Sequence, residues 1–169
     1  MNAPESIRRM PITTPMVVMS AMFVAAGGFI HARQWLDVYR HVPADAPGAA
    51  VVRIGFPLNA AASFLFVVAL ALVFRRPSRL TRPVVWAAVA FQVASLATLV
   101  ATRVGSVVGW AEPIWTPAAQ QTLAVEAAAI AALVVLALFS RRGQAAAGPL
   151  PHLHGCRCKA ACVGEAPAA

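Results

Sequence analysis

A single carboxylate inside a long apolar stretch is the strongest candidate for a functional group in this sequence. Residues 116–139 read TPAAQQTLAVEAAAIAALVVLALF, in which Glu126 is the only charged side chain. About 20 apolar residues suffice for a helix that crosses a bilayer. An ionisable group within such a helix is costly, so Glu126 needs a partner, a proton or a functional role.

Polar side chains from other apolar stretches fall at depths similar to that of Glu126. At about 1.5 Å of rise per residue, Glu126 lies roughly 12 Å below the outer rim of its helix. On the same scale Asn59 lies about 8 Å deep, Ser95 about 10 Å and Gln92 about 15 Å. His31 is expected above them, at the mouth of the first helix. The sequence therefore predicts a candidate intramembrane polar site formed by Glu126, Asn59, Gln92, Ser95 and His31.

This polar site has two interpretations. In the functional one, a small cavity open to the outer side binds a headgroup, a quinone-like molecule or a proton. In the structural one, Glu126 bonds to Asn59 or Gln92 and holds the helices together, at under about 1 kcal/mol for each such contact. A carboxylate is an expensive choice for a purely structural role. No basic residue is expected at the same depth to pair with it.

The positions and spacing of the histidines and cysteines limit the cofactors that the sequence predicts. A haem in a membrane bundle usually takes two axial histidines, and only His31 lies near an apolar stretch, so haem is not expected and no cofactor is predicted. The C-terminal segment contains five potential ligands for zinc or copper(I): His152, His154, Cys156, Cys158 and Cys162. Their spacing fits no standard zinc module. The alternative is a disordered tail that merely contains cysteines.

Four apolar stretches must position the polar site. The chain of 169 residues is 60% hydrophobic and 12% charged, whereas soluble domains are about a quarter charged. The sequence predicts an all-α, four-helix transmembrane bundle with short loops in residues 1–142 and a disordered cytoplasmic tail in residues 143–169. The predicted helices cover residues 14–34, 50–74, 84–102 and 117–140. A cleaved signal peptide in residues 1–26 is the alternative for the first helix.

Basic residues predict the orientation in the membrane. Ten of the fourteen Lys and Arg residues lie in the N-terminal segment, in residues 75–82 and in residues 141–169. The other two connections contain the remaining four. Because basic residues concentrate on the cytoplasmic side, we expect a multi-pass protein of the plasma (inner) membrane with both termini in the cytoplasm.

The expected role is that of a non-enzymatic accessory or scaffold subunit. No Gly-rich phosphate loop and no zinc-protease or serine-triad motif occurs in the sequence. The first alternative is a small-molecule or proton-linked binding or transport site around Glu126, and a further one is metal handling by the Cys/His tail. The expected partners are the lipid bilayer and either a second copy or another membrane protein. Nucleic acid is not expected, since the net charge of +8 gathers at the ends of apolar stretches.

Three features resemble those of small bacterial four-helix membrane proteins of the DoxX-like kind and their uncharacterised relatives. They are the glycine pair before a histidine (Gly27-Gly28-Phe29-Ile30-His31), the short basic central loop, and the third and fourth helices rich in small residues. The similarity extends over most of residues 16–139. It implies a plasma-membrane protein that serves as a partner subunit of a redox or thiol-linked complex, and it assigns no functional residue.

Overall fold

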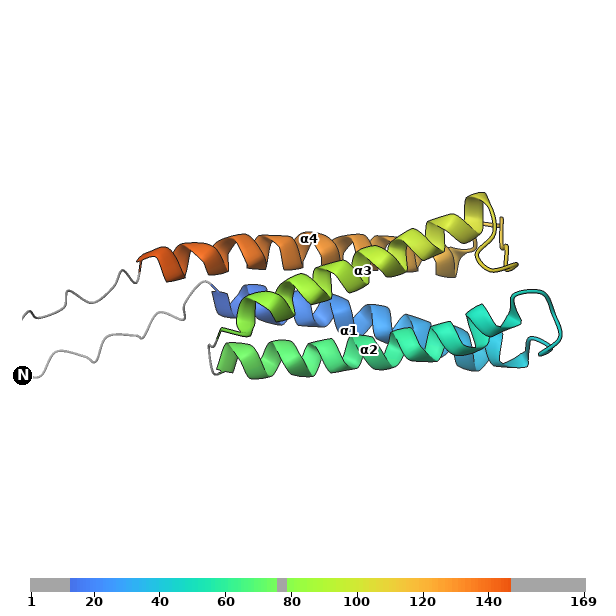
Figure 1. Cartoon of the computed structure of the whole chain (residues 1–169), viewed down its shortest axis with the longest axis horizontal. Coiled ribbons are helices and arrows are strands. Elements are labelled where there is room, and N and C mark those ends of the chain that lie inside the picture. The colour runs from blue at the N-terminus through green and yellow to red at the C-terminus, as the bar shows by residue number, and fades with distance from the viewer. Residues whose placement is uncertain (1–12, 76–78, 147–169) are drawn as a thin grey trace, which may run out of the picture.

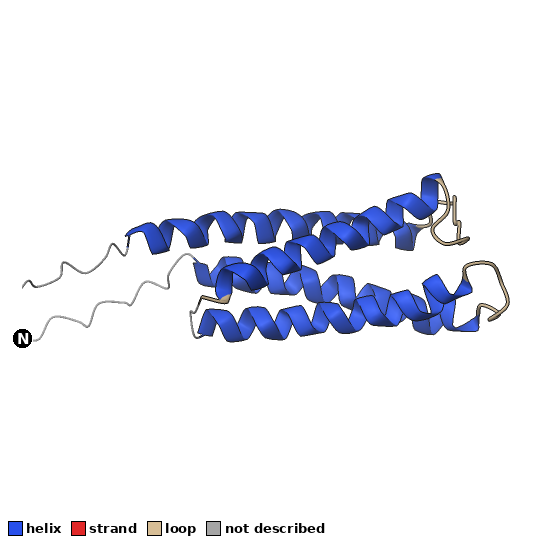
Figure 2. Ribbon diagram, viewed as in Figure 1, coloured by secondary structure: helices blue, strands red, loops and turns tan. Residues whose placement is uncertain are grey.

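Four long α-helices form a bundle in which each helix runs antiparallel to the next one along the chain (Figure 1, Figure 2). The computed structural model describes residues 13–75 and 79–146. Within them, the order is α1 (Thr13–Asp37), a short 3-10 helix η1 (Tyr39–His41), α2 (Ala49–Arg75), α3 (Thr81–Val104) and α4 (Pro117–Ala146). This arrangement confirms the predicted all-α four-helix fold.

Figure 1 shows that α1 begins and α4 ends at the same end of the bundle, which is also where α2 leads into α3. We name this the terminal end. The opposite end, with the α1–α2 and α3–α4 connections, is named the loop end. The helices extend beyond the predicted ranges, most of all at the terminal end of α4. The disordered tail was predicted to begin at residue 143, but residues 143–146 belong to α4. The rest of the predicted tail, residues 147–169, and the N-terminal residues 1–12 lie outside the described part of the chain.

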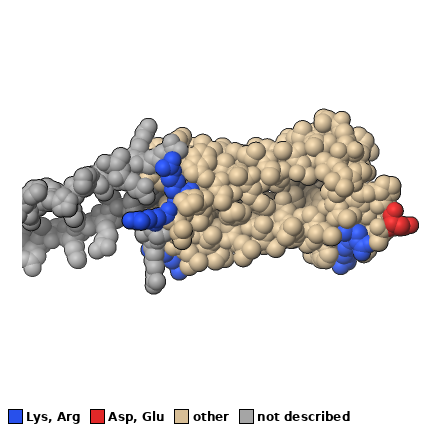
Figure 3. Space-filling model, viewed as in Figure 1, with Lys and Arg blue, Asp and Glu red and all other residues tan. Residues whose placement is uncertain are grey.

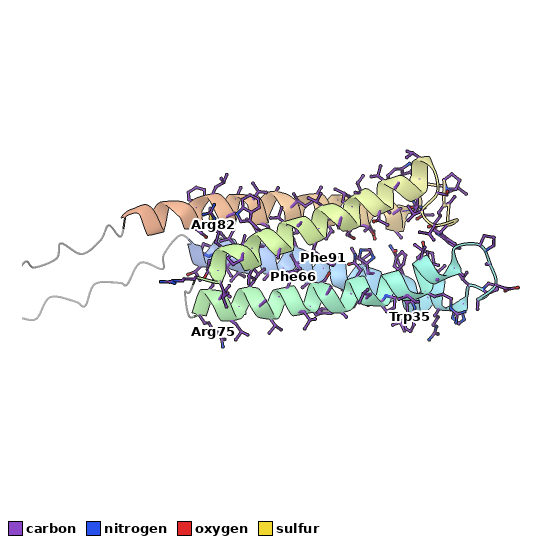
Figure 4. All side chains as sticks on the ribbon, viewed as in Figure 1. Trp35, Phe66, Arg75, Arg82 and Phe91 are labelled. Carbon is purple, nitrogen blue, oxygen red and sulfur yellow. The ribbon has the colours of Figure 1, made fainter. Side chains whose placement is uncertain are left out.

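All four helices are long and apolar enough to cross a membrane. The shortest, α3, has 24 residues, which at about 1.5 Å per residue exceeds the roughly 30 Å of a bilayer's hydrocarbon core. Lys and Arg gather at the two ends of the face shown in Figure 3, with none along its middle. Arg75 and Arg82 mark the terminal end in Figure 4. The protein is therefore a membrane protein by fold and surface.

The interior of the bundle is divided between an apolar half and a polar half. Nine buried apolar residues form the core of the terminal half: Val24, Leu70, Val85, Ala88, Val89, Ala129, Leu133, Leu136 and Ala137. On every helix, these apolar residues lie nearer the terminal end than the residues of the predicted polar site. The apolar half packs the four helices together, and the polar half, which lies nearer the loop end, contains the predicted polar site.

Two close contacts join α1 to α2. A Cβ placed on Gly28 would lie 2.7 Å from Cβ of Ser63, so only glycine lets the two helices approach this closely. Nearer the loop end, Pro57 stands inside α2 and cannot donate to the carbonyl of Arg53, four residues earlier. The indole Nε1 of Trp35 donates to that carbonyl at 3.0 Å. A freed backbone acceptor thus gains a partner from α1, as membrane-spanning helices with proline require.

Candidate functional site

The carboxylate of Glu126 meets the imidazole of His31 between α4 and α1. Nε2 of His31 lies 2.8 Å from Oε1 of Glu126, and the two residues are 8% and 1% exposed. A buried carboxylate without a partner would cost several kcal/mol, and His31 supplies that partner. The sequence places His31 above the other residues of the predicted site, at the mouth of the first helix, whereas the structure places it in contact with Glu126. The reason is that α1 continues to Asp37, almost two turns beyond His31.

Residues from α3 and α2 extend this pair into a chain of hydrogen bonds. The hydroxyl of Ser95 donates to Oε1 of Glu126 at 2.6 Å, and Nδ2 of Asn59 donates to Oγ of Ser95 at 2.6 Å. Ser63 donates to Oδ1 of Asn59 at 3.4 Å. Each of the four helices therefore contributes one side chain to a connected network of His31, Glu126, Ser95 and Asn59. We name these four residues the polar network.

Gln92 is the one predicted site residue that the structure does not bring into the polar network. It is buried, with 2% of its surface exposed, and it lies three residues closer to the terminal end than Ser95. That offset corresponds to about 4.5 Å along the helix and about 60° of rotation. None of the hydrogen bonds that join the polar network includes Gln92. Similar depth alone therefore does not decide which residues join Glu126, because the direction of each side chain around its helix axis also matters.

Two atoms of the polar network retain unused hydrogen-bonding capacity. Oε2 of Glu126 and Nδ1 of His31 are buried and have no hydrogen-bond partner among the described residues. Buried polar atoms are rarely left this way in folded proteins. The imidazole ring is packed edge-on against Phe56, with ring centroids 5.2 Å apart. His31 is therefore held in place by its Nε2 contact and by packing, while its other nitrogen stays available.

A second polar contact lies one turn nearer the loop end, between the same two helices. Nε2 of Gln34 donates to Oγ1 of Thr122 at 3.1 Å. Gln34 follows His31 by three residues and Thr122 precedes Glu126 by four, so each shares a helix face with its neighbour. The sequence reasoning did not single out this pair. The sequence pattern that indicates this pair is a polar residue three positions after His31 and another four positions before Glu126.

A cavity of about 220 Å³ lies next to the polar network, between α2 and α3. His31, Asn59 and Ser95 line its inner end. Its walls are mostly apolar or weakly polar, and the residues that form them are Val51, Val52, Gly55, Phe56, Thr98, Leu99 and Thr102. Figure 1 shows why the space exists, since α2 and α3 lie close together near the terminal end and separate toward the loop end. Of the five predicted site residues, His31, Asn59 and Ser95 thus line the inner end of a cavity, whereas Glu126 and Gln92 do not line it.

The loop end of the cavity is closed by an ion pair that the sequence reasoning missed. Nη1 of Arg103 lies 3.0 Å from Oε2 of Glu112 and also donates to the backbone carbonyl of Glu112. The hydroxyl of Tyr39 donates to Oε2 of Glu112 at 2.8 Å, and the amide of Glu112 donates to the carbonyl of Thr102 at 2.9 Å. Arg103 and Glu112 both line the cavity, together with Trp110. We name Tyr39, Arg103, Trp110 and Glu112 the cap.

A tight turn places Trp110 in the cap. Val107 and Trp110 exchange two backbone hydrogen bonds of 2.8 and 2.9 Å, around Val108 and Gly109, whose φ angles are 50° and 84°. Two positive φ values define a type I′ turn. Trp110 then packs on Gly48, where an added Cβ would lie 2.7 Å from Cα of Trp110. The α3–α4 connection is therefore fixed against the α1–α2 connection and covers the cavity.

Metal binding has no support in the described part of the chain. Among residues 13–75 and 79–146, no group of three His, Cys, Asp or Glu side chains is arranged to hold a metal ion. The five predicted tail ligands, His152, His154, Cys156, Cys158 and Cys162, lie outside the described residues. Metal handling by the tail stays a prediction.

Fold and site together define a class: a four-helix membrane protein with a buried polar network beside a capped cavity. No protein-family model, no curated protein and no solved structure matches this chain. The function must therefore be inferred from the geometry of the cavity.

Proposed function

We propose that this membrane protein binds a ring-sized, mostly apolar molecule that carries hydrogen-bonding oxygens. The observation that supports this proposal is the 220 Å³ cavity with polar groups at both ends and apolar walls between them. For scale, an engineered apolar cavity of about 150 Å³ in another protein takes up benzene. Pockets lined by apolar side chains with a few well-placed polar groups are the usual sites for small ligands.

The polar groups favour a ligand with oxygens at opposite ends of a ring, as in a quinone headgroup. At the inner end, His31, Asn59 and Ser95 offer imidazole, amide and hydroxyl groups. At the outer end, Nε of Arg103 is buried and has no hydrogen-bond partner among the described residues, so the guanidinium has a donor to spare. The Phe56 ring forms one wall. We infer that one ligand oxygen faces the polar network and the other faces Arg103.

This proposal is tested by titrating the protein in lipid nanodiscs with a methoxy-substituted benzoquinone that has no side chain. Trp110 lines the cavity, so binding is expected to quench tryptophan fluorescence in a saturable way. Ser95→Ala removes the hydroxyl that links Asn59 to Glu126, and with it two hydrogen bonds of the polar network, and it is expected to weaken binding roughly fivefold.

The matched control is Ser20→Ala. Ser20 is also a buried serine in the bundle, but it lies in the apolar half and does not line the cavity, so its replacement should leave binding unchanged. Quenching that does not saturate in the wild type, or that Ser95→Ala and Ser20→Ala affect alike, would refute the proposal.

The predicted role as a non-enzymatic accessory or scaffold subunit stays a prediction, and so does the resemblance to DoxX-like proteins. The exposed apolar side chains of the helices, such as Met22, Leu58 and Leu65, suit contact with lipid as well as with a second copy or another protein. The cavity provides a specific observation in favour of ligand binding, and we therefore place ligand binding first.

We further propose that the terminal end faces the cytoplasm and that the membrane is the plasma membrane. The support is the sequence count of basic residues, ten of fourteen of which belong to segments at this end. Reporter fusions at residues 80 and 145 are expected to show cytoplasmic enzyme activity and no periplasmic activity. Periplasmic activity at either position would refute this orientation.

A further inference from the structure

We propose that the ligand enters from the bilayer, through a slot between α2 and α3 beside Gly55, and that it carries an apolar chain which lies in this slot. This inference rests on the proposed binding function and specifies its ligand class as a single-ring amphiphile with an apolar tail. Two routes can lead into the cavity, one through the cap and one between α2 and α3.

The way through the cap is closed by several independent contacts. Glu112 is held by Arg103, by Tyr39 and by the carbonyl of Thr102. The Arg103 side chain is only 4% exposed. The contact between Gly48 and Trp110 leaves no space for even one added carbon atom. A ligand arriving from water at the loop end would have to break this ion pair or move the α3–α4 connection.

The way between α2 and α3 is open at Gly55. A Cβ added to Gly55 would have no atom within 4 Å, although Gly55 lines the cavity. On either side of it along α2, Ile54 and Leu58 are 62% and 65% exposed, as expected of side chains that contact lipid. Gly55 therefore lies where the cavity meets the lipid-facing surface of α2.

The facing wall on α3 suits an apolar chain. Thr98 is exposed and lines the cavity, but its hydroxyl donates to the carbonyl of Ala94 at 2.8 Å. A hydroxyl bonded to its own helix backbone presents its methyl group outward and can face lipid without an unsatisfied donor. Leu99 completes this wall. The slot thus offers no hydrogen-bond donor that would exclude a hydrocarbon.

The slot ends toward the middle of the bundle at an aromatic contact. Phe66 of α2 and Phe91 of α3 lie with ring centroids 5.2 Å apart, and Figure 4 shows both rings in the middle of the bundle, on these two helices. The polar network lies on the loop side of this contact. A ring bound against the polar network would therefore direct its substituent out through the slot, because the aromatic contact and the cap close the other directions.

The test uses two probes: the tail-less benzoquinone above and the same ring with a decyl chain. Gly55→Leu places a branched side chain in the slot, at a helix position where an added Cβ has no atom within 4 Å. Excluding even two methylene groups of the chain corresponds to roughly tenfold in affinity. We expect Gly55→Leu to weaken binding of the decyl probe by at least that factor and to change binding of the tail-less ring much less. Ala61→Leu is the control, since Ala61 is exposed on α2 and outside the cavity lining.

The route is tested separately by association kinetics with Tyr39→Phe, which removes one hydrogen bond of the cap. A lateral route predicts an unchanged association rate for the decyl probe, whereas a faster rate would overturn the inference in favour of a route through the cap. Equal weakening of both probes by Gly55→Leu, or no weakening of either, would also overturn it. If neither probe binds the wild type, the proposed binding function itself fails, together with this inference.

Discussion

Replacing His31 with leucine is expected to lower the free energy of unfolding by about 3–5 kcal/mol, because it leaves a buried carboxylate without its nitrogen partner. Glu126 is 1% exposed, and Ser95 alone would then donate to it. Glu126→Leu is expected to cost less, since a neutral imidazole is easier to bury than a carboxylate. Thermal unfolding in mild detergent, or titration with a denaturing detergent, measures both changes.

The double variant His31→Leu/Glu126→Leu decides whether the two residues act as a pair. Apolar side chains of similar volume often replace a buried pair at little cost, so the double variant should recover most of the stability that His31→Leu loses. Ser20→Ala is expected to be neutral, because Oγ of Ser20 has no hydrogen-bond partner among the described residues. Additive losses in the double variant would show that His31 and Glu126 stabilise the bundle independently of each other.

Glu112→Ala is expected to lower the free energy of unfolding by about 2–3 kcal/mol. The change leaves the guanidinium of Arg103 buried without its carboxylate, and it removes the acceptor of the Tyr39 hydroxyl. The cap should also loosen, so we expect faster proteolysis within residues 105–116. Thermal unfolding and limited proteolysis of the protein in nanodiscs measure the two effects.

A second ion pair of this protein provides the control for the cap. Arg33 and Asp37 pair at 3.3 Å on the surface of α1, with side chains 73% and 61% exposed. Exposed pairs of this kind contribute about 0–1 kcal/mol, so Asp37→Ala should change stability little. If Glu112→Ala cost no more than Asp37→Ala, the burial of Arg103 would have no energetic consequence and the cap would not be held by this ion pair.

The sequence alone predicted the four helices and the approximate depth of the polar residues. Apolar runs of spanning length leave few alternatives to membrane helices, and a fixed rise per residue converts sequence position into depth. Depth is not sufficient for contact, because it ignores rotation about the helix axis. For that reason Asn59 and Ser95 join Glu126, whereas Gln92 is buried nearby without joining the polar network.

The cap could not be predicted in the same way, because no periodic pattern specifies the path of a loop. Its position depends on a turn in which Val108, a β-branched residue, adopts a positive φ of 50°, a conformation rare for such side chains. The pairing of Arg103 with Glu112 follows only once that turn exists. The cavity has a similar origin, since it results from the separation of α2 and α3 rather than from any local sequence signal.

The contact between His31 and Glu126 has a consequence for the response of the protein to voltage. An imidazole and a carboxylate that share one proton carry no net charge together, whichever of the two groups holds the proton. A transmembrane potential performs work of about 2.3 kcal/mol per elementary charge per 100 mV only on net charge that moves through it. Binding of a neutral ring should therefore be insensitive to voltage. Binding of an anion at the same depth would move charge through part of the field and would strengthen or weaken as the potential is changed.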